Sequence, residues 1–343
     1  MSEDKTTIVD EQDDGTVKES RRDFLKKLGI AAAATAAAPA AAAKAASIAE
    51  HLQGHFELMS DEQKQEAIAR LEERYKEQFG KEVTVANTPA PEGVLFGYAL
   101  NIAKCIGCRR CVEACVRENN QSRDPKIQWI RVLRMERGTE TFELGNWNKG
   151  FPDSSPLGDY GIQAGGHADK PVGISGDAEH YYNPELVPED NAFYFPVQCQ
   201  QCEKPACVRA CPVRATYRDP NGIVVIDYNW CIGCRMCQLA CPYWARRFNW
   251  GEPVLPNEDM NPKTHYLGNR PRMRGVMEKC TFCLQRVRDG RYPACVEACP
   301  VGARKFGNLL DPESEVRKVL ATKKVFRFKE EFSTYPKFFY YMD

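Results

Sequence analysis

The sequence has no excess of charge of either sign, because Lys and Arg together number 47 and Asp and Glu together also number 47. A nucleic-acid surface favours a basic excess and a solvating tail an acidic one, so the composition supports neither function. Histidine is also scarce, with five residues scattered along 343. We expect these histidines to be surface or helix residues rather than metal ligands. They are His51, His55, His167, His180 and His265.

Long apolar runs and catalytic motifs are missing as well. The alanine-rich stretch near the start is too short and too weakly apolar to predict a membrane span, and no other segment reaches eighteen apolar residues. We find no paired nucleophile and base, no G-x-G-x-x-G loop and no open metal site. We therefore expect this chain to perform no substrate chemistry of its own.

An export signal is predicted at the N-terminus, over residues 1–45. Residues 20–26 read SRRDFLK and precede an alanine-rich run over residues 31–43. Arg21 and Arg22 resemble the core of a twin-arginine signal, and Ala43-Lys44-Ala45 suits a cleavage site. A basic start to an amphipathic helix is the alternative. Signals of this type imply transport of a protein already folded around its cofactor, which weakens the disulfide interpretation that an exported cysteine-rich chain otherwise suggests.

Cysteine is the abundant residue, with sixteen copies that fall into four motifs with none left over. The first and third motifs share the spacing C-x2-C-x2-C-x3-C, and a proline follows the last cysteine of the second, third and fourth motifs: Pro212, Pro242 and Pro300. The four motifs are Cys105, Cys108, Cys111 and Cys115; Cys199, Cys202, Cys207 and Cys211; Cys231, Cys234, Cys237 and Cys241; and Cys280, Cys283, Cys295 and Cys299.

This spacing is typical of [4Fe–4S] ligation. Three thiolates three residues apart wrap a loop around one cluster, and the fourth cysteine reaches a second cluster. We expect a helix to begin at the fourth cysteine, with the proline in its first turn. Zinc prefers two cysteine pairs around one tetrahedron, and disulfides impose no such repeat. A zinc- or disulfide-stabilised binding module stays open as an alternative, and a colourless purified protein would favour it.

The motifs are also internal repeats, which indicates how they pair. CIGCRRCVEAC at residues 105–115 resembles CIGCRMCQLAC at residues 231–241, and ACVRACPVRA at residues 206–215 resembles ACVEACPVGA at residues 294–303. The short stretch between the second and third motifs predicts a turn at residues 219–222 and a strand at residues 223–226, as in a two-cluster ferredoxin core. The two inner motifs then pair locally, and the two outer motifs pair across the chain.

At this point the sequence resembles the iron–sulfur subunits of the dimethyl sulfoxide reductase superfamily over residues 96–343. The order of the four motifs carries the resemblance, together with CPYWARRFNW at residues 241–250 and YPKFFYY at residues 335–341. It implies an α+β fold of tandem two-cluster ferredoxin-like modules with loop insertions. The outer module is expected from residues 96–198 and 260–310, the inner module from 199–259 and a tail from 311–343, after an N-terminal extension at 46–95.

The resemblance also implies the ligands of four [4Fe–4S] clusters. Each cluster takes three cysteines from one motif and one from its partner motif. The implied sets are Cys105, Cys108, Cys111 and Cys299; Cys280, Cys283, Cys295 and Cys115; Cys199, Cys202, Cys207 and Cys241; and Cys231, Cys234, Cys237 and Cys211.

The function implied is single-electron transfer between a molybdopterin-type catalytic subunit and an integral membrane quinone-interacting subunit, in the periplasm. Exported tetrathionate and polysulfide reductase subunits are the family members that the chain resembles. The alternatives are an electron-transfer subunit of a periplasmic hydrogenase or of a cytochrome c-linked quinone complex, with cytochrome c as a partner, and a free-standing polyferredoxin. Two features depart from the pattern: no membrane helix ends the chain, and the insert at residues 116–198 is long, with a glycine-rich part expected to be a surface loop.

Two helices and a set of cations complete the predictions. Residues 60–80 predict an amphipathic helix with a Ser60/Gln63 capping box, an apolar stripe ending at Phe79 and Gly80 beyond it. The stripe packs either on this chain or on a partner. Asp311-Pro312 predicts a helix that runs to about residue 320. Five cations flank the motifs and either raise cluster potentials or are solvated surface charges: Lys104, Arg109, Arg110, Arg235 and Lys279.

Overall fold

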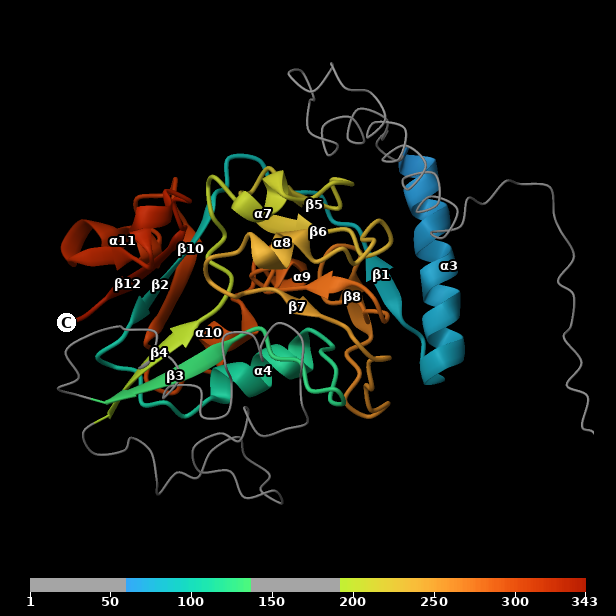
Figure 1. The fold of residues 1–343 in the computed structure, drawn as a ribbon, viewed down its shortest axis with the longest axis horizontal. Coiled ribbons are helices and arrows are strands. Elements are labelled where there is room, and N and C mark those ends of the chain that lie inside the picture. The colour runs from blue at the N-terminus through green and yellow to red at the C-terminus, as the bar shows by residue number, and fades with distance from the viewer. Residues whose placement is uncertain (1–59, 137–191) are drawn as a thin grey trace, which may run out of the picture. The chain divides into compact units, whose positions relative to one another are not determined.

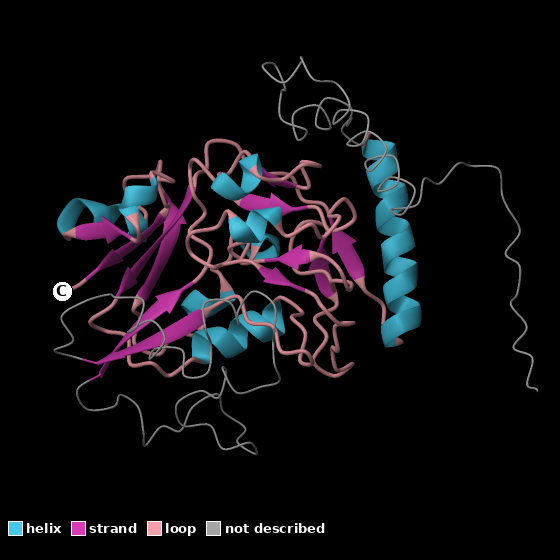
Figure 2. Cartoon of the chain, viewed as in Figure 1, coloured by secondary structure: helices cyan, strands magenta, loops and turns pink. Residues whose placement is uncertain are grey.

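The computed structural model describes residues 60–136 and 192–343 (Figure 1). Helices and strands are mixed along both segments, in agreement with the predicted α+β class (Figure 2). The predicted signal at residues 1–45 and the glycine-rich part of the insert lie outside the described residues. Within those two segments, no helix has both the length and the apolar character that a membrane span requires.

One long helix and several very short ones are present in the described segments. The helices are α3 (Asp61–Phe79), α4 (Arg110–Glu118), α7 (Ala206–Arg209), α8 (Met236–Leu239), α9 (Leu284–Val287), α10 (Ala294–Glu297) and α11 (Glu315–Thr322), with a 3-10 turn at Glu330–Phe332. Most of the short helices carry a cysteine, so they belong to the cysteine motifs rather than to a helical layer.

The largest sheet of the described residues joins the two ends of the cysteine-rich region. Its strand order is β10 (Arg304–Asn308), β2 (Phe96–Asn101), β12 (Phe338–Tyr341) and β11 (Val325–Arg327). Strand β2 pairs antiparallel with β10 and parallel with β12. The ring of Tyr98 stacks on that of Phe338 at 4.5 Å between centroids. The aromatic side chains of the C-terminal strand β12 therefore pack into the same core as those of β2 and β10.

The remaining strands form two-stranded ribbons. The predicted turn and strand at residues 219–226 are confirmed: Gly222 has a positive φ of 74°, and Asp219 accepts a hydrogen bond from the amide of Ile223. The ribbons are β1 (Thr84–Ala86) with β8 (Lys263–His265), β3 (Arg131–Glu136) with β4 (Ala192–Val197), β5 (Thr216–Arg218) with β6 (Val224–Ile226), and β7 (Arg247–Phe248) with β9 (Met277–Glu278).

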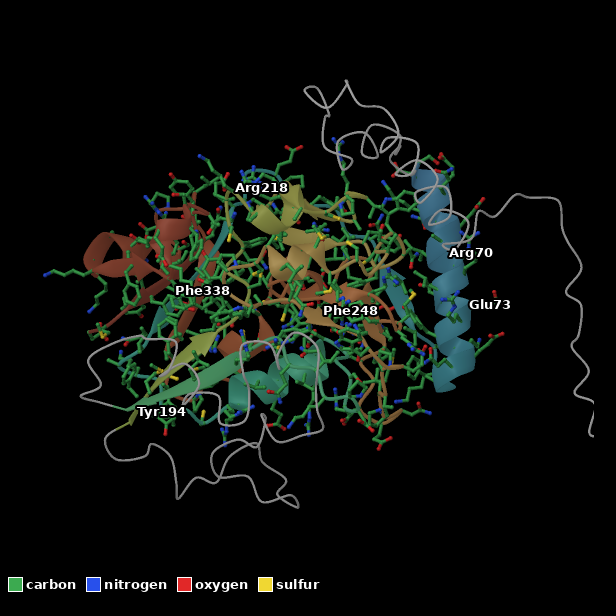
Figure 3. The ribbon with its side chains drawn as sticks, in the orientation of Figure 1. Arg70, Glu73, Tyr194, Arg218, Phe248 and Phe338 are labelled. Atoms are coloured by element: carbon green, nitrogen blue, oxygen red, sulfur yellow. The ribbon has the colours of Figure 1, made fainter. Side chains whose placement is uncertain are left out.

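Helix α3 forms as the sequence predicted. Ser60 and Gln63 make both hydrogen bonds of the capping box, and Gly80 ends the helix in the left-handed region. The apolar stripe is buried against Met260 and Tyr266 of this same chain. Arg70 and Glu73 lie on the exposed side (Figure 3). The stripe therefore packs on the chain's own core rather than serving as a free docking face.

The helix predicted near residue 311 begins later than expected. Ser314, not Asp311, is the N-cap of α11, and its hydroxyl accepts a hydrogen bond from the amide of Arg317. The carboxylate of Asp311 instead accepts from the amide of Glu313, within the turn that precedes the helix. The Asp-Pro pair therefore forms a turn, because the aspartate side chain bonds to the backbone two residues further on.

Candidate metal centre

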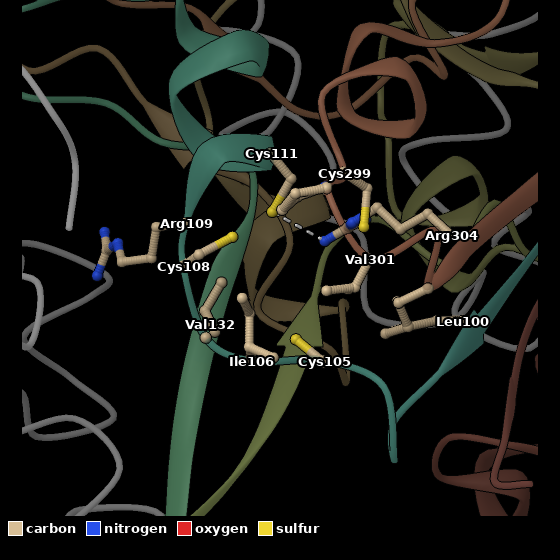
Figure 4. Close-up of a pocket in the computed structure, with 13 residues that line it drawn as sticks. Leu100, Cys105, Ile106, Cys108, Arg109, Cys111, Val132, Cys299, Val301 and Arg304 are labelled. Atoms are coloured by element: carbon tan, nitrogen blue, oxygen red, sulfur yellow. Dashed lines mark hydrogen bonds between the residues drawn. The ribbon is translucent and has the colours of Figure 1, made fainter. Parts of the chain in front are cut away.

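Four cysteines from two distant motifs line one pocket. Cys105, Cys108 and Cys111 lie on one side and Cys299 on the other, around about 340 Å³ of empty volume, which includes its open side (Figure 4). We call these four residues the Cys105 group. A second pocket of about 280 Å³ is lined by Cys231, Cys234, Cys237 and Cys211, the Cys231 group.

Two further groups of four cysteines are identified by the thiols whose charges act on Cys115 and on Cys202. Burial raises the pKa of Cys115 well above its usual range, and the charges of Cys283, Cys280 and Cys295 raise it further. These four residues are the Cys280 group. Cys202 lies similarly close to the other members of the Cys199 group, which are Cys199, Cys207 and Cys241. Each group thus combines three cysteines of one motif with the last cysteine of another.

The two C-I-G-C-R loops point their backbone amides at sulfur because they visit the left-handed region twice. Gly107 and Arg109 have φ of 75° and 56°, and Gly233 and Arg235 have φ of 72° and 61°. Burial raises the pKa of Cys105 and of Cys231, and the hydrogen bonds that these thiols accept from the amides of Gly107 and Gly233 partly offset that rise. Glycine is required at the first of these positions because a Cβ at Gly107 would collide with the ring of Tyr194, and one at Gly233 with the carbonyl oxygen of Gly275.

The prediction that a helix begins at each fourth cysteine is wrong. The short helices α7, α8 and α10 begin before the third cysteine and end before the fourth. Pro212, Pro242 and Pro300 therefore follow a helix end, which suits a residue that cannot continue the hydrogen-bond ladder. In the first motif Val116 stands in place of proline, and α4 continues beyond Cys115 to Glu118. The C-x3-C spacing is one helical turn between the third and fourth cysteines.

The thiols are buried, and burial disfavours their charged form. It raises the pKa of Cys105 and Cys202 to about 12, and that of Cys237 to about 11. Four crowded thiolates are stable in such surroundings only with a compensating positive charge, which iron bound as a cluster supplies. Around the Cys105 group the other lining is largely apolar, including Leu100, Ile106 and Val132. The residues present fit a thiolate-bound [4Fe–4S] cluster.

The Cys280 group receives hydrogen bonds from side chains as well as from the backbone. The amide of Gln121 donates to Cys115 at 3.1 Å, and that of Asn119 lies 3.5 Å from the sulfur of Cys283. The hydroxyl of Tyr98 lies 3.3 Å from the sulfur of Cys295. Donors of this kind stabilise negative charge on sulfur, and the spacing of the cysteines gives no indication of them.

Two arginines that the sequence did not single out lie against the thiols. Arg304 donates to Cys111 at 3.2 Å (Figure 4), and the charges of Cys207, Cys237 and Cys241 raise the pKa of buried Arg246. Both arginines stand five residues after the last cysteine of a Cys-Pro motif, Cys299 or Cys241. That shared offset is the sequence signal that could have identified them.

Of the five cations predicted from the sequence, Arg110 acts on a cluster thiol: burial raises the pKa of Cys108, and the charge of Arg110 partly offsets that rise. The others have other surroundings. Lys279 is fully buried but donates to backbone carbonyl oxygens, one of them Cys280 at 2.9 Å. Arg235 lies over the ring of Trp250 at 4.4 Å, and Arg109 donates to Gln128 at 2.8 Å with its guanidinium turned away from the cysteines (Figure 4). Lys104 and Arg110 are exposed.

The four groups are neighbours in a row. The charge of Cys111 acts on the pKa of Cys295, which relates the Cys105 group to the Cys280 group. The charge of Cys199 acts on Cys280, and that of Cys207 acts on Cys237. The order is therefore the Cys105, Cys280, Cys199 and Cys231 groups.

His265 is neither a surface nor a helix residue. It is buried in β8, where its Nδ1 accepts from the amide of Leu267 and its Nε2 lies 3.2 Å from the carbonyl oxygen of Thr88. Burial lowers the pKa of His265 to about 4. The other four histidines lie outside the described residues. Over residues 60–136 and 192–343, no set of three or more His, Cys, Asp or Glu side chains is arranged to hold a single metal ion.

Comparison with known proteins agrees with this description. A family model described as a 4Fe-4S dicluster domain matches residues 191–272 and 268–309. A Halobacterium salinarum protein assigned as an iron-sulfur subunit of dimethyl sulfoxide reductase is 39% identical over 71% of this chain and 78% of its own length. The iron-sulfur cluster-binding subunit of Nitratidesulfovibrio vulgaris menaquinone reductase is 34% identical over 72% and 88%. A selenate reductase subunit of Mesobacillus selenatarsenatis is 32% identical over 70% of each chain.

Proposed function

Because this chain belongs to the family of iron–sulfur subunits that includes those of dimethyl sulfoxide reductase, we propose that it is an electron-transfer subunit with four [4Fe–4S] clusters. The observation that carries the proposal is the row of four cysteine groups, each of which supplies four thiols. The clusters, when bound, would supply one-electron redox chemistry. The chain itself would perform no substrate chemistry.

Each cysteine group would hold one cluster, and the surrounding residues would bury it. The apolar lining excludes water, the loop amides of Gly107 and Gly233 point at sulfur, and the short helices set the spacing of the third and fourth ligands. In this proposal the Cys105 and Cys280 groups form an outer module from residues 96–198 and 260–310. The Cys199 and Cys231 groups form an inner module from residues 199–259, followed by the tail at residues 311–343.

The partners proposed are a molybdopterin-type catalytic subunit and an integral membrane quinone-interacting subunit. Relatives named for dimethyl sulfoxide reductase, selenate reductase and menaquinone reductase support this pairing. An electron-transfer chain joins such subunits without binding the terminal substrate. We therefore expect no reduction of oxyanion or sulfur substrates by the purified chain alone, and steady turnover without a catalytic subunit would contradict the proposal.

Cluster content is tested on full-length protein purified without oxygen. Four clusters require roughly sixteen iron atoms and sixteen acid-labile sulfides per chain, with paramagnetic signals on reduction. A colourless protein that contains zinc, or an iron content of only two clusters, would overturn the proposal. Gel filtration after gentle membrane extraction then tests the partners: co-elution with other subunits is expected, and a chain that elutes alone supports a free polyferredoxin.

We propose that the chain is exported through the twin-arginine route and is held at the membrane by a partner subunit. The motif SRRDFLK supports this location. The variant Arg21→Lys with Arg22→Lys should leave cluster-loaded protein in the cytoplasm. Fractionation that finds the double variant exported normally would remove the proposal of export by this route.

A further inference from the structure

We propose that Arg304 and Arg246 set the reduction potentials of the clusters two at a time. Each arginine places one fixed positive charge between the two clusters of a pair and makes both easier to reduce. The pairs are the Cys105 and Cys280 groups for Arg304, and the Cys199 and Cys231 groups for Arg246. This inference rests on the proposed function, because it requires a cluster in each group.

Arg304 is connected to both groups of the outer pair. Its Nη2 donates to the sulfur of Cys111 at 3.2 Å, in the Cys105 group. Its Nη1 donates to the hydroxyl of Tyr98 at 3.0 Å, and that hydroxyl lies 3.3 Å from the sulfur of Cys295, in the Cys280 group. The side chain of Arg304 is only 3% exposed. One guanidinium therefore spans the two groups with a single tyrosine between them.

Arg246 has the equivalent place in the inner pair. The thiols whose charges act on it belong to both groups: Cys207 and Cys241 of the Cys199 group, and Cys237 of the Cys231 group. Its Nη1 donates to Thr216 at 3.2 Å. Its buried Nη2 has no hydrogen-bond partner among the described residues. Arg246 therefore has an unpaired, buried N–H group on a guanidinium on which thiols of both groups act.

The counter-charges of these two arginines are unusual. Several other buried arginines pair with carboxylates, among them Arg272 with Glu278 at 3.0 Å and Arg288 with Asp219 at 2.8 Å. Over the described residues, neither Arg304 nor Arg246 forms an ion pair with a carboxylate. A buried charge needs a partner, and the cysteine groups are the negative charge within reach.

The positions of Arg304 and Arg246 in the sequence repeats also indicate that each arginine serves one pair of cysteine groups. The residue five places after the last cysteine is Arg304 in the fourth motif, Arg246 in the third and Thr216 in the second. Each pair of motifs therefore contributes one arginine at this position, and in the inner pair the arginine donates to the threonine at the matching position. One arginine for each pair of motifs matches a single positive charge that two neighbouring clusters share.

The physical effect follows from charge and burial. Reduction adds one negative charge to a cluster, and a cation beside the ligand thiolates stabilises that charge. Because the arginines are buried, solvent and salt screen the interaction weakly. A shared cation also offsets the repulsion between two reduced clusters of the same pair.

The test is a redox titration of full-length protein with dithionite and mediators, followed by electron paramagnetic resonance. Arg304→Gln should lower the potentials of the outer pair alone, with at least a roughly tenfold change in the ratio of reduced to oxidised cluster, or about 59 mV for one electron. Arg246→Gln should do the same to the inner pair alone. Arg110→Gln is the control, because it removes an exposed charge beside the Cys105 group; its shift should be no more than roughly threefold.

The outcomes separate the inference from the function on which it rests. Wild-type protein without four clusters refutes the proposed function. Wild-type protein with four clusters, whose Gln variants shift all four potentials equally or no more than Arg110→Gln, overturns the inference alone. If a Gln variant does not load clusters, Arg304→Met and Arg246→Met decide, because methionine is an unbranched apolar side chain that also removes the charge. The potentials of the one pair should fall by at least roughly tenfold in the ratio of reduced to oxidised cluster; four unchanged potentials, or four that move together, overturn the inference.

Discussion

The outer and inner pairs of cysteine groups use the same local motifs but close them in different ways. The inner pair draws all its cysteines from residues 199–241, around the hairpin of β5 and β6. The outer pair joins residues 105–115 to residues 280–299, and strands β2 and β10 hold these segments together. The difference teaches that the motif fixes the loop around three thiols, while the fourth thiol can come from either near or far.

The surroundings of the two pairs differ as well. All four thiols of the Cys280 group are buried, and side-chain donors such as Gln121 and Asn119 lie against them. In the Cys231 group Cys234 is exposed, and Trp230, Met236 and Leu239 beside it are exposed too. A buried group depends on donors from the protein, whereas an exposed group is also stabilised by water.

The largest expected effect comes from removing the ligand that one motif supplies to its partner motif, in the outer pair and in the inner pair. Cys115→Ser and Cys211→Ser should each lose a ligand, but Cys115→Ser should cost roughly 2 kcal/mol more in the free energy of unfolding, because it opens a loop about eight times longer. Electron paramagnetic resonance should show that Cys115→Ser disturbs the signal that Cys280→Ser disturbs. If it disturbs the signal that Cys111→Ser disturbs, the crossed pairing of the outer motifs is wrong.

The matching glycines of the two C-I-G-C-R loops give the next largest effect. Both have positive φ, but a Cβ at Gly233 would collide with the backbone carbonyl oxygen of Gly275, whereas one at Gly107 would press on the ring of Tyr194. A side chain can move more easily than a backbone. We expect Gly233→Ala to destabilise the protein by about 3 kcal/mol and Gly107→Ala by about 1–2 kcal/mol. Denaturant unfolding measures both, and an equal cost would contradict the comparison.

A smaller effect distinguishes the pairs by pH. The segment of the inner pair contains no histidine, whereas buried His265 lies in the stretch that returns to the outer pair. Burial lowers the pKa of His265 from 6.5 to about 4, so the unfolded chain takes up the proton first and stability is lost as the pH falls from about 6.5 towards 4. At pH 5.5 the loss should be about 1.4 kcal/mol relative to pH 7.5.

Thermal unfolding at the two pH values, in wild type and in His265→Gln, isolates this contribution. The variant should be less stable at neutral pH, because it loses the bond from the amide of Leu267. Its loss between pH 7.5 and pH 5.5 should be smaller than that of wild type. Parallel pH curves for the two proteins would show that His265 is not the titrating group.

The smallest effect concerns the side-chain donors of the buried group. Gln121→Leu removes the amide that donates to Cys115 at 3.1 Å and should lower the potential of the Cys280-group cluster alone. We expect a shift of about 1 kcal/mol, since a hydrogen bond to a charged group is worth about 1.5–3 kcal/mol and only part of it depends on the redox state. A redox titration measures it, and a shift in the Cys231-group cluster would contradict the comparison.

Several features were predictable from the sequence because they depend on neighbouring residues. Ser60, Gln63 and Gly80 specify the ends of α3, and its apolar spacing specifies the buried stripe. The turn before Ile223 follows from Asp219 and Gly222. The start of α11 and the position of the helix within each cysteine motif were predicted wrongly, because a proline or an aspartate suits a turn and a helix end as well as a helix start.

The sequence by itself determined the chemistry of this protein: sixteen thiols at iron–sulfur spacing, in repeats that pair inner with inner and outer with outer. The tertiary structure decided which distant charges face those thiols. Lys104 and Arg110 are close to the motifs in sequence yet exposed, whereas Arg304 reaches Cys111, about 190 residues away, because β10 pairs with β2. Spacing along a loop fixes its own ligands, but the field around them is the sum of contacts between segments that only the folded chain brings together.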